Sequence, residues 1–269
     1  MGRNGLVDVP VEVGEPALSV TGLGVVYGTP PAHREVLAGV ELSVAAGEFV
    51  SVVGPSGAGK TTLIRCLAGL QQPSTGRVFV AGEPVTGPPS TLALVSQDYS
   101  RSLMPWLTVA ENVRLPLRGK GIAREEQCAR VDQALGAVGL ADVRSSRPWQ
   151  LSGGMQQRVS IARALAYQPR VLLMDEPFAS VDAQTRADLE DLVLGLQRAS
   201  GISVVLVTHD VDESVYLADR VVVLGGAPAA VAHQVEVLLG RERDQIRTKS
   251  LPKFVSLRAE VLEQIRRFG

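Results

Sequence analysis

The sequence has few cysteines, few aromatic residues and no long hydrophobic run. Its two cysteines, Cys66 and Cys128, lie far apart, which argues against a disulfide framework, a CxxC redox pair or a cysteine-based zinc site. We expect both to be small core residues in a reducing compartment. The longest apolar runs, such as 204–207 and 221–224, fall far short of the roughly 20 residues that span a bilayer. We therefore expect that the chain does not cross a membrane by itself.

An excess of charge of either sign is also missing. Lys and Arg number 27 against 28 for Asp and Glu, which gives a formal net charge of -1. A strongly basic surface is typical of nucleic-acid binding, so we expect no nucleic-acid partner and a local site for any phosphate. The composition, 45% hydrophobic in 269 residues, is that of a soluble globular protein with one large domain and room for an insert. Residues 1–16 mix charges and prolines, which predicts a poorly ordered tail rather than a signal peptide.

The order of the predicted elements indicates an α/β fold. Strand-favouring segments are 17–27, 36–44, 48–53, 171–174 and 202–207. After Lys60 apolar residues recur every three or four positions, as in a helix with one buried face; they are Leu63, Cys66, Leu67 and Leu70. A second helical pattern closes at Gly201, between the last two strands. Because strands alternate with helices, we expect a mostly parallel sheet.

A mostly helical stretch interrupts these strands between residues 107 and 168. Cys128, Val131, Leu135 and Val138 form an apolar stripe that ends at Gly139. This stretch is the candidate inserted subdomain.

A phosphate-binding loop is indicated where the third strand meets the first helix. Its residues are Gly54, Pro55, Ser56, Gly57, Ala58, Gly59, Lys60 and Thr61, which match G-x-x-x-x-G-K-[ST]. Glycines let successive backbone N–H groups face one centre, and the helix adds its partial positive end. Lys60 supplies a charge near the β- and γ-phosphates, and the Thr61 hydroxyl is placed for Mg²⁺.

Two carboxylates end the apolar strand at 171–174. Asp175 is the candidate for holding Mg²⁺ through a water, because it follows the strand directly. Glu176 is the candidate that orients or deprotonates water beyond the γ-phosphate. A general base of this kind contributes roughly 10²–10⁴ in rate, which separates hydrolysis from mere binding. Without a P-loop beside it, an acidic pair at the end of a strand usually marks a solvent-exposed turn.

A second phosphate-binding end is predicted at Leu151-Ser152-Gly153-Gly154-Met155-Gln156-Gln157-Arg158. Ser152 either caps a helix or donates its hydroxyl to a phosphate, and the amides of Gly153 and Gly154 allow close approach of an anion. One nucleotide already has a P-loop for its phosphates. A second such end therefore indicates that this segment binds the nucleotide of another copy of the chain.

Together these motifs resemble the nucleotide-binding subunit of an ABC transporter, from about Ala17 to the carboxyl terminus. Tyr27 matches the aromatic residue that stacks on adenine, Gly54 to Thr62 the Walker A loop, Gln97 the Q-loop, Leu151 to Arg158 the signature, Val171 to Glu176 Walker B, Ser180-Val181-Asp182 the D-loop, and His209 the switch histidine. Their joint order carries the resemblance, since a lone tyrosine, glutamine or histidine is more often a packing or surface residue.

The resemblance implies a P-loop NTPase core with a mostly parallel sheet, an antiparallel β subdomain and an inserted α-helical subdomain. The implied division is a flexible tail at 1–16, an ATP-binding core at 17–97 and 169–226, the helical subdomain with the signature at 98–168, and a short helical tail at 227–269. In the last segment, Leu257, Val261, Ile265 and Phe268 make one helical stripe.

The resemblance also implies cofactors, partners and roles. ATP and Mg²⁺ are clamped in a head-to-tail homodimer between one P-loop and the partner's signature, to which Ser152, Gly153, Gly154 and Gln156 belong. The equivalents of Glu176 and His209 position the attacking water and contact the γ-phosphate. The equivalent of Gln97 touches Mg²⁺ and senses an integral membrane permease, itself served by a periplasmic or lipid-anchored substrate-binding protein. The chain is then a peripheral ATPase on the cytoplasmic face of the membrane.

The stretch at 102–113 resembles the importer subgroup for nitrate, sulfonate, taurine and related oxyanions, through its pattern PW-x-TV-x-x-NV. Pro105 and Trp106 form either a wall of a groove for a permease helix or an anchor of the small subdomain. The residues after Gly225 are too few for the added β-barrel domain of sugar-importer ATPases. Residues 225–230 depart from the subgroup, which usually has a basic Pro-Gly turn there.

Three other functions are open to a chain with these motifs. An exporter of lipids or drugs has a nearly identical motor. A soluble ABC ATPase of DNA repair, chromosome organisation or translation carries coiled-coil inserts, zinc modules or tandem cassettes, and none is visible here. A non-hydrolytic ATP-binding regulator is disfavoured by Glu176 and His209.

Overall fold

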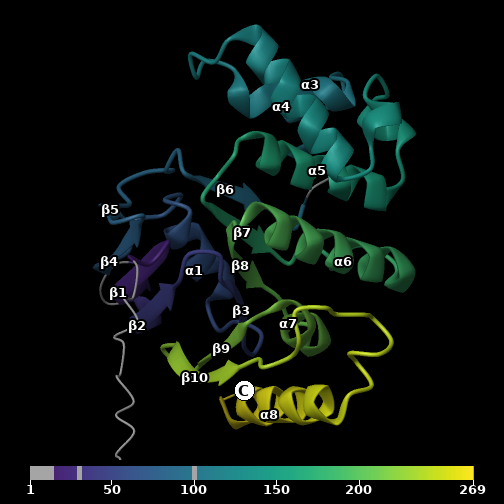
Figure 1. The fold of residues 1–269 in the computed structure, drawn as a ribbon. Helices are drawn as coiled ribbons and strands as arrows, with labels where there is room; N and C mark the ends of the chain where they lie inside the picture. The colour runs from purple at the N-terminus through teal and green to yellow at the C-terminus, as the bar shows by residue number, and fades with distance from the viewer. Residues whose placement is uncertain (1–14, 29–31, 99–101, 269) are drawn as a thin grey trace, which may run out of the picture.

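A six-stranded sheet forms the centre of the computed structural model, which describes residues 15–28, 32–98 and 102–268 (Figure 1). Its strands, in spatial order, are β10 (Ala230–Glu236), β9 (Arg220–Gly225), β3 (Phe49–Val53), β8 (Ser203–Val207), β7 (Val171–Asp175) and β6 (Leu92–Val95). The pairs from β9 to β6 are parallel, and β10 is antiparallel to β9. All residues of β3 and β8 are buried, because helices or a second sheet cover both faces.

A smaller antiparallel sheet contains β2 (Arg34–Val44), β1 (Leu18–Tyr27), β4 (Thr75–Val80) and β5 (Glu83–Pro84), in that order. Its inward side chains share one hydrophobic cluster with helix α1 (Lys60–Leu67) and with the central strands. The P-loop helix is therefore enclosed by both sheets, which fixes the loop that precedes it.

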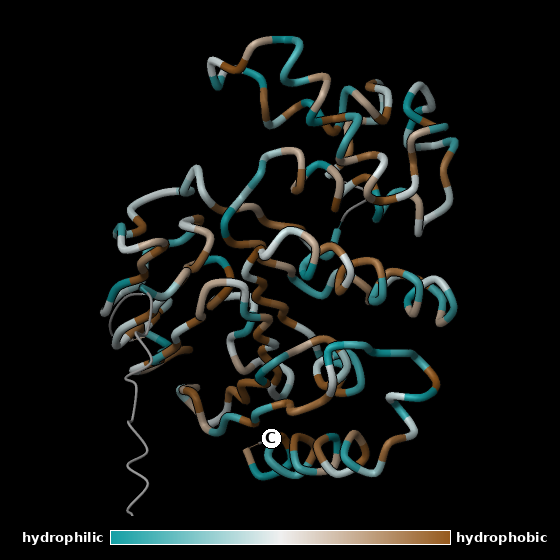
Figure 2. Tube along the Cα trace, in the orientation of Figure 1, coloured by the Kyte–Doolittle hydropathy of each residue, from teal (hydrophilic) through white to brown (hydrophobic). Residues whose placement is uncertain are grey.

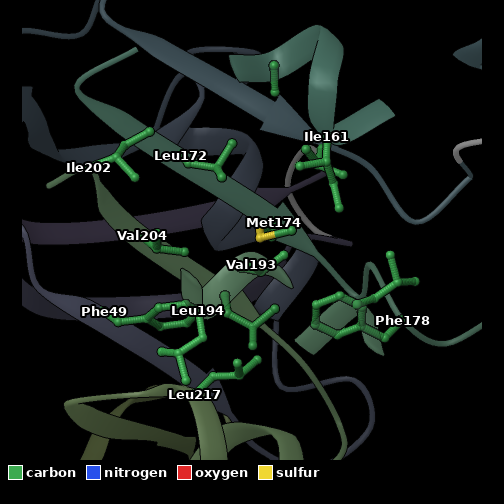
Figure 3. Close-up of a cluster of buried hydrophobic side chains, with 14 of the residues drawn as sticks. Phe49, Ile161, Leu172, Met174, Phe178, Val193, Leu194, Ile202, Val204 and Leu217 are labelled. Atoms are coloured by element: carbon green, nitrogen blue, oxygen red, sulfur yellow. The ribbon is translucent and has the colours of Figure 1, made fainter. Parts of the chain in front are cut away.

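The other face of the central sheet is covered by α6 (Ala183–Ser200), α7 (Val211–Leu217) and α8 (Pro252–Phe268). Figure 3 shows the packing: Phe49 and Met174 of the sheet meet Val193 and Leu194 of α6. Figure 2 shows hydrophobic residues gathered along the central strands, whereas the outer turns are mostly hydrophilic. This packing holds the ends of α6 and α7 at the edge of the sheet where the candidate site lies.

The helices between β6 and β7 form a separate layer above the sheet in Figure 1. They are α3 (Val109–Arg114), η1 (Leu115–Leu117), α4 (Arg124–Ala137), η2 (Ala141–Val143), η3 (Pro148–Gln150) and α5 (Gly153–Ala166). The predicted stripe packs as expected at Val131, Leu135 and Val138, all at most 2% exposed. The α/β architecture with an antiparallel sheet and a helical insert is thus confirmed.

Three details differ from the sequence predictions. The segment 227–269, expected to be a helical tail, contains strand β10, because it pairs along the exposed edge of β9 before α8 begins. Leu70 lies beyond the end of α1 and is 56% exposed, since Gly69 turns the chain with a φ of 67°. Cys66 is buried as expected, but Cys128 is only half-buried on α4.

Two further expectations concern the ends of the chain and the membrane. Most of the predicted tail, residues 1–14, lies outside the described residues. Among the residues that are described, no helix is both long and apolar enough to span a bilayer. The tail stripe is formed as predicted on α8, where Leu257 and Val261 are buried and Ile265 packs beside them.

Candidate functional site

The P-loop lies where β3 ends and α1 begins. Gly59 caps α1 with a φ of 77°, a conformation that a side chain disfavours. A Cβ added there would come within 2.8 Å of Leu37 in the small sheet. Ser56 and Gly57 are exposed at the tip of the loop, with Gly57 at a φ of 81°. The loop therefore presents bare backbone to the solvent side, as phosphate binding requires.

Lys60 lies inside this loop. Its Nζ donates to the carbonyl oxygens of Gly54 at 2.8 Å and Pro55 at 3.0 Å, and the residue is 8% exposed. Burial lowers the pKa of Lys60, whereas the carboxylates of Glu176 and Asp175 raise it. The ammonium group is thus held near the two acids predicted to work with it.

Asp175 ends β7 in a half-buried position. Burial raises the pKa of Asp175, the nearby Glu176 carboxylate raises it further, and Arg65 and Lys60 lower it. Two neighbouring carboxylates in a desolvated position are stabilised by a cation. The described residues contain no group of three or more His, Cys, Asp or Glu side chains arranged to hold a metal. The residues predicted to hold Mg²⁺ are the Asp175 carboxylate, the Thr61 hydroxyl and the Gln97 side chain, to which phosphate oxygens and water would add.

Glu176 is the centre of a three-residue cluster. Its Oε2 accepts a hydrogen bond from Gln97 Nε2 at 3.2 Å and lies 3.2 Å from His209 Nδ1. Gln97, Glu176 and His209 follow the three neighbouring parallel strands β6, β7 and β8. The order of strands in the sheet thus brings together residues up to 112 positions apart in the sequence. Glu176 has a φ of 44°, which is unusual for a residue with a side chain and is typical of functional sites.

Tyr27, the predicted adenine-stacking residue, lies beside the P-loop helix. Its hydroxyl lies 3.2 Å from Thr62 Oγ1 and donates to Gln71 Oε1 at 2.9 Å. The residue is 43% exposed at the end of β1. The ring therefore stands at the rim of the phosphate loop, where a base can stack on it. Gln71 was not predicted, because nothing in its local sequence distinguishes it from a surface glutamine.

The signature residues open α5, in the helical layer. The Ser152 side chain accepts from Met155 N at 3.3 Å, which makes Ser152 the N-cap, and Ser152 and Gly153 are exposed. A Cβ at Gly154 would lie 2.3 Å from Thr185 Cγ2. Packing against Thr185 therefore also requires a glycine at this position. Gln156 Nε2 donates to the carbonyls of Pro148 and Leu151, and thereby fixes the preceding turn.

The two predicted phosphate-binding ends are not joined within one chain. Among the described residues, no hydrogen bond or ion pair links 151–156 to the P-loop or to the cluster of Gln97, Glu176 and His209. Asp182, the predicted D-loop acid, is the N-cap of α6 and accepts from Thr185 N and Oγ1. These backbone and hydroxyl donors lower the pKa of Asp182.

The loop that carries Pro105 and Trp106 is built around a buried asparagine. Asn112 is fully buried; it accepts from Met104 N at 2.8 Å and donates to the carbonyls of Met104, Leu107 and Thr108. Trp106 is 67% exposed. The structure therefore rules out the alternative in which Trp106 anchors the helical subdomain, and leaves it on the surface.

Sequence comparison identifies the family. The family model described as "ABC transporter" matches residues 37–179, more than half of the chain. The chain belongs to the ABC transporter family. The aliphatic sulfonates import ATP-binding protein of Xanthomonas axonopodis pv. citri is 49% identical to this ABC protein over 213 residues, which cover 79% of this chain and 84% of that protein. The nitrate import ATP-binding protein of Synechococcus elongatus is 39% identical, covering 92% and 91%.

A solved ABC structure has the same architecture. A dimeric ATP-binding cassette in a post-hydrolysis state with ADP and phosphate superimposes with a TM-score of 0.71 at 31% identity, covering 83% of this chain and all of that one. The P-loop fold predicted from the sequence is therefore the fold of the family. The protein is an ABC-type ATP-binding subunit and an ATPase.

Proposed function

We propose that this ABC ATPase drives an importer of sulfonate, nitrate or a similar oxyanion, with each ATP bound between the P-loop of one copy and the signature of a second. The observation that carries the proposal is the cluster in which Gln97 and His209 contact the Glu176 carboxylate beside Lys60. The exposed signature end on α5 supplies the second half of the site. The similarity to a dimeric cassette supports the head-to-tail pairing.

Each residue of the cluster has a role that follows from its position. Lys60 and the P-loop amides bind the β- and γ-phosphates, and Thr62 lies next to them on α1. Glu176 activates the attacking water as general base, and His209 contacts the γ-phosphate. Gln97, which follows β6, contacts Mg²⁺ and senses the permease. In the closed dimer, Ser152, Gly153, Gly154 and Gln156 of one copy meet the nucleotide of the other, and Asp182 lies between them.

Mg²⁺ fits the residues present. Asp175 is desolvated and carries a raised pKa beside Glu176, so a divalent cation would stabilise its ionised form. Thr61 and Gln97 supply neutral oxygen donors. When bound, the ion neutralises charge on the phosphates during phosphoryl transfer.

The partners follow from the importer assignment. The relatives are named as sulfonate, nitrate and taurine import ATP-binding proteins. We propose that the chain binds a permease on the cytoplasmic face of the membrane and that a substrate-binding protein delivers the oxyanion. Purification of the full chain from detergent-solubilised membranes should recover a permease. Recovery of only nucleic acid or ribosomes would favour a soluble ABC ATPase, and a lipid- or drug-dependent ATPase would favour an exporter.

Removal of the Tyr27 ring should weaken ATP binding. We expect Tyr27→Ala to raise the KM for ATP by roughly tenfold, because stacking of a base on an aromatic ring contributes about 1–3 kcal/mol. Tyr27→Phe keeps the ring and should change KM by less than about twofold. Steady-state ATPase assays over a range of ATP concentrations measure both. A wild-type KM in Tyr27→Ala would show that the adenine lies elsewhere.

Trp106 should matter for the permease and not for hydrolysis by the free subunit. We expect Trp106→Ala to reduce permease recovery in pull-downs by roughly tenfold, since exposed Trp residues are common binding hot spots. Its ATPase rate without permease should match wild type. Trp149, 68% exposed in η3, is a matched control. Equal loss in Trp149→Ala, or none in Trp106→Ala, would contradict this docking site.

A further inference from the structure

His209 is flanked by two residues that charged side chains hold in place, the buried Glu213 and the partly exposed Arg186. On one side, Thr208 Oγ1 donates to Glu213 Oε2 at 2.6 Å. On the other, Arg186 Nη1 donates to Asp210 Oδ2 at 3.1 Å. Asp210 also caps α7 by accepting from the backbone of Asp212 and Glu213. The segment that carries the switch histidine is therefore fixed from both ends.

The same segment is tied to the P-loop strand. Thr208 N donates to Val52 O at 3.2 Å, and Val52 precedes the first P-loop glycine by two positions. Asp210 N donates to Thr208 Oγ1 at 3.0 Å. Thr208 directly follows β8 and joins it to the end of β3 and the start of α7.

Glu213 and Arg186 are joined to each other across two helices. Glu213 lies on α7 and is 4% exposed; Arg186 lies in the first turn of α6, four residues after Asp182. Arg186 Nε is 3.7 Å from Glu213 Oε1 and has no hydrogen-bond partner among the described residues. The pair is thus an ion pair without a direct hydrogen bond, and a small shift of α6 would change it.

We propose that Glu213 and Arg186 are positioning residues that hold His209 against Glu176 and couple its place to the start of α6. The inference rests on the proposed role of His209 in hydrolysis. The Glu213 carboxylate is costly to bury, whereas the Arg186 side chain is partly exposed. Apart from their contact with each other, Glu213 binds Thr208 and Arg186 binds Asp210, the two residues that flank His209. A displacement of the D-loop end of α6 would therefore reach His209 through Arg186.

The charge state of Glu213 makes the positioning of His209 depend on pH. Burial raises the pKa of Glu213 to about 7; Asp210 and Glu190 raise it too, whereas the Thr208 hydroxyl and Arg186 lower it. Those four residues come from α6, from α7's cap and from the end of β8. On α8, Arg258 pairs with Asp212 instead. Below about pH 7 Glu213 is protonated and its attraction for Arg186 is lost, so kcat should fall there.

Replacement of Glu213 by glutamine tests the proposal. We expect Glu213→Gln to reduce kcat by roughly tenfold above pH 8, with the KM for ATP changed by less than about twofold, because a misplaced catalytic group slows chemistry more than binding. From pH 6 to pH 9 the kcat of Glu213→Gln should stay constant, at about the value that the wild type has at pH 6. The kcat of the wild type should instead rise as the pH increases through about 7. A wild-type profile in Glu213→Gln would overturn the proposal.

Two controls separate positioning from general damage. Glu190 is another buried carboxylate, 1% exposed, held by Lys249 and Gln245 away from His209. Glu190→Gln should keep wild-type kcat above pH 8, where Glu213 is ionised with or without the Glu190 charge; an equal loss there would overturn the proposal. Thr208→Ser keeps the hydroxyl and should keep kcat, and Thr208→Val should lose it. This second pair decides the matter if Glu213→Gln fails to fold.

One further variant distinguishes failure of this inference from failure of the proposed function. His209→Ala should lose ATPase activity if His209 acts in hydrolysis. Full activity in His209→Ala would remove the proposed role of His209 and the inference with it. Loss in His209→Ala together with full activity in Glu213→Gln would overturn only the positioning role.

Discussion

Replacement of Glu176 by glutamine should nearly stop ATP turnover while ATP still binds. We expect a fall of roughly 10²–10⁴ in kcat, the usual contribution of a positioned general base. Glutamine has the same shape and can still accept from Gln97 Nε2, so the cluster keeps its packing. It cannot take a proton from water at neutral pH. Without hydrolysis, the contacts that close the dimer around ATP persist, because the γ-phosphate remains.

Size-exclusion chromatography with and without ATP measures this second effect. We expect Glu176→Gln to elute as an ATP-dependent dimer, and the wild type to elute mainly as a monomer after turnover. His233 and Glu260 form a second His–carboxylate contact, at 3.4 Å between β10 and α8, outside the candidate site. Glu260→Gln is thus the matched control and should hydrolyse ATP normally. Monomers only, or wild-type turnover, for Glu176→Gln would contradict the mechanism.

Two inactive variants should restore activity when they are mixed. Lys60→Ala removes the P-loop charge and leaves the signature intact. Gly153→Asp leaves the P-loop intact and puts a negative charge where the partner's phosphate is expected. An acidic residue at a helix N-terminus is favourable for folding, and Gly153 is exposed, so this variant should remain folded.

The expected size of the effect follows from counting sites. Each variant alone has two defective sites per dimer, whereas a mixed dimer has one intact site, made by the good P-loop of one copy and the good signature of the other. With random pairing, the mixture should recover up to about a quarter of wild-type activity. ATPase assays on each variant and on equal mixtures measure this. A mixture as inactive as its components would argue against a site shared between copies.

The local motifs were predictable because their chemistry depends on neighbours in the sequence. The P-loop glycines, Lys60 and the strand that ends in Asp175 each signal their conformation through residue type and spacing. Ser152 was recognised as a helix cap or phosphate ligand, and the structure shows that it caps α5. Its role toward a partner's nucleotide stays a prediction, as do the domain boundaries and the remaining site roles.

Some elements could not be predicted because their signal was weak. Strand β10 forms by pairing with the edge of β9, and the residues 230–236 have an irregular exposure pattern with little alternation. Leu70 continues a helical period past the glycine that ends α1. In both cases a tertiary partner or a single backbone conformation outweighed the local pattern.

By itself, the sequence determined the phosphate loop and the acidic strand end, because each depends on local backbone conformation and on residues close together in the chain. It also determined the fold class and the family, because these follow from the order of elements and motifs along the chain. Only the tertiary structure decided that Trp106 is exposed, that Tyr27 contacts Gln71, and that Glu213 and Arg186 enclose the His209 segment. These features join side chains from separate elements. Their contacts depend on how the strands and helices pack, which residue spacing does not record.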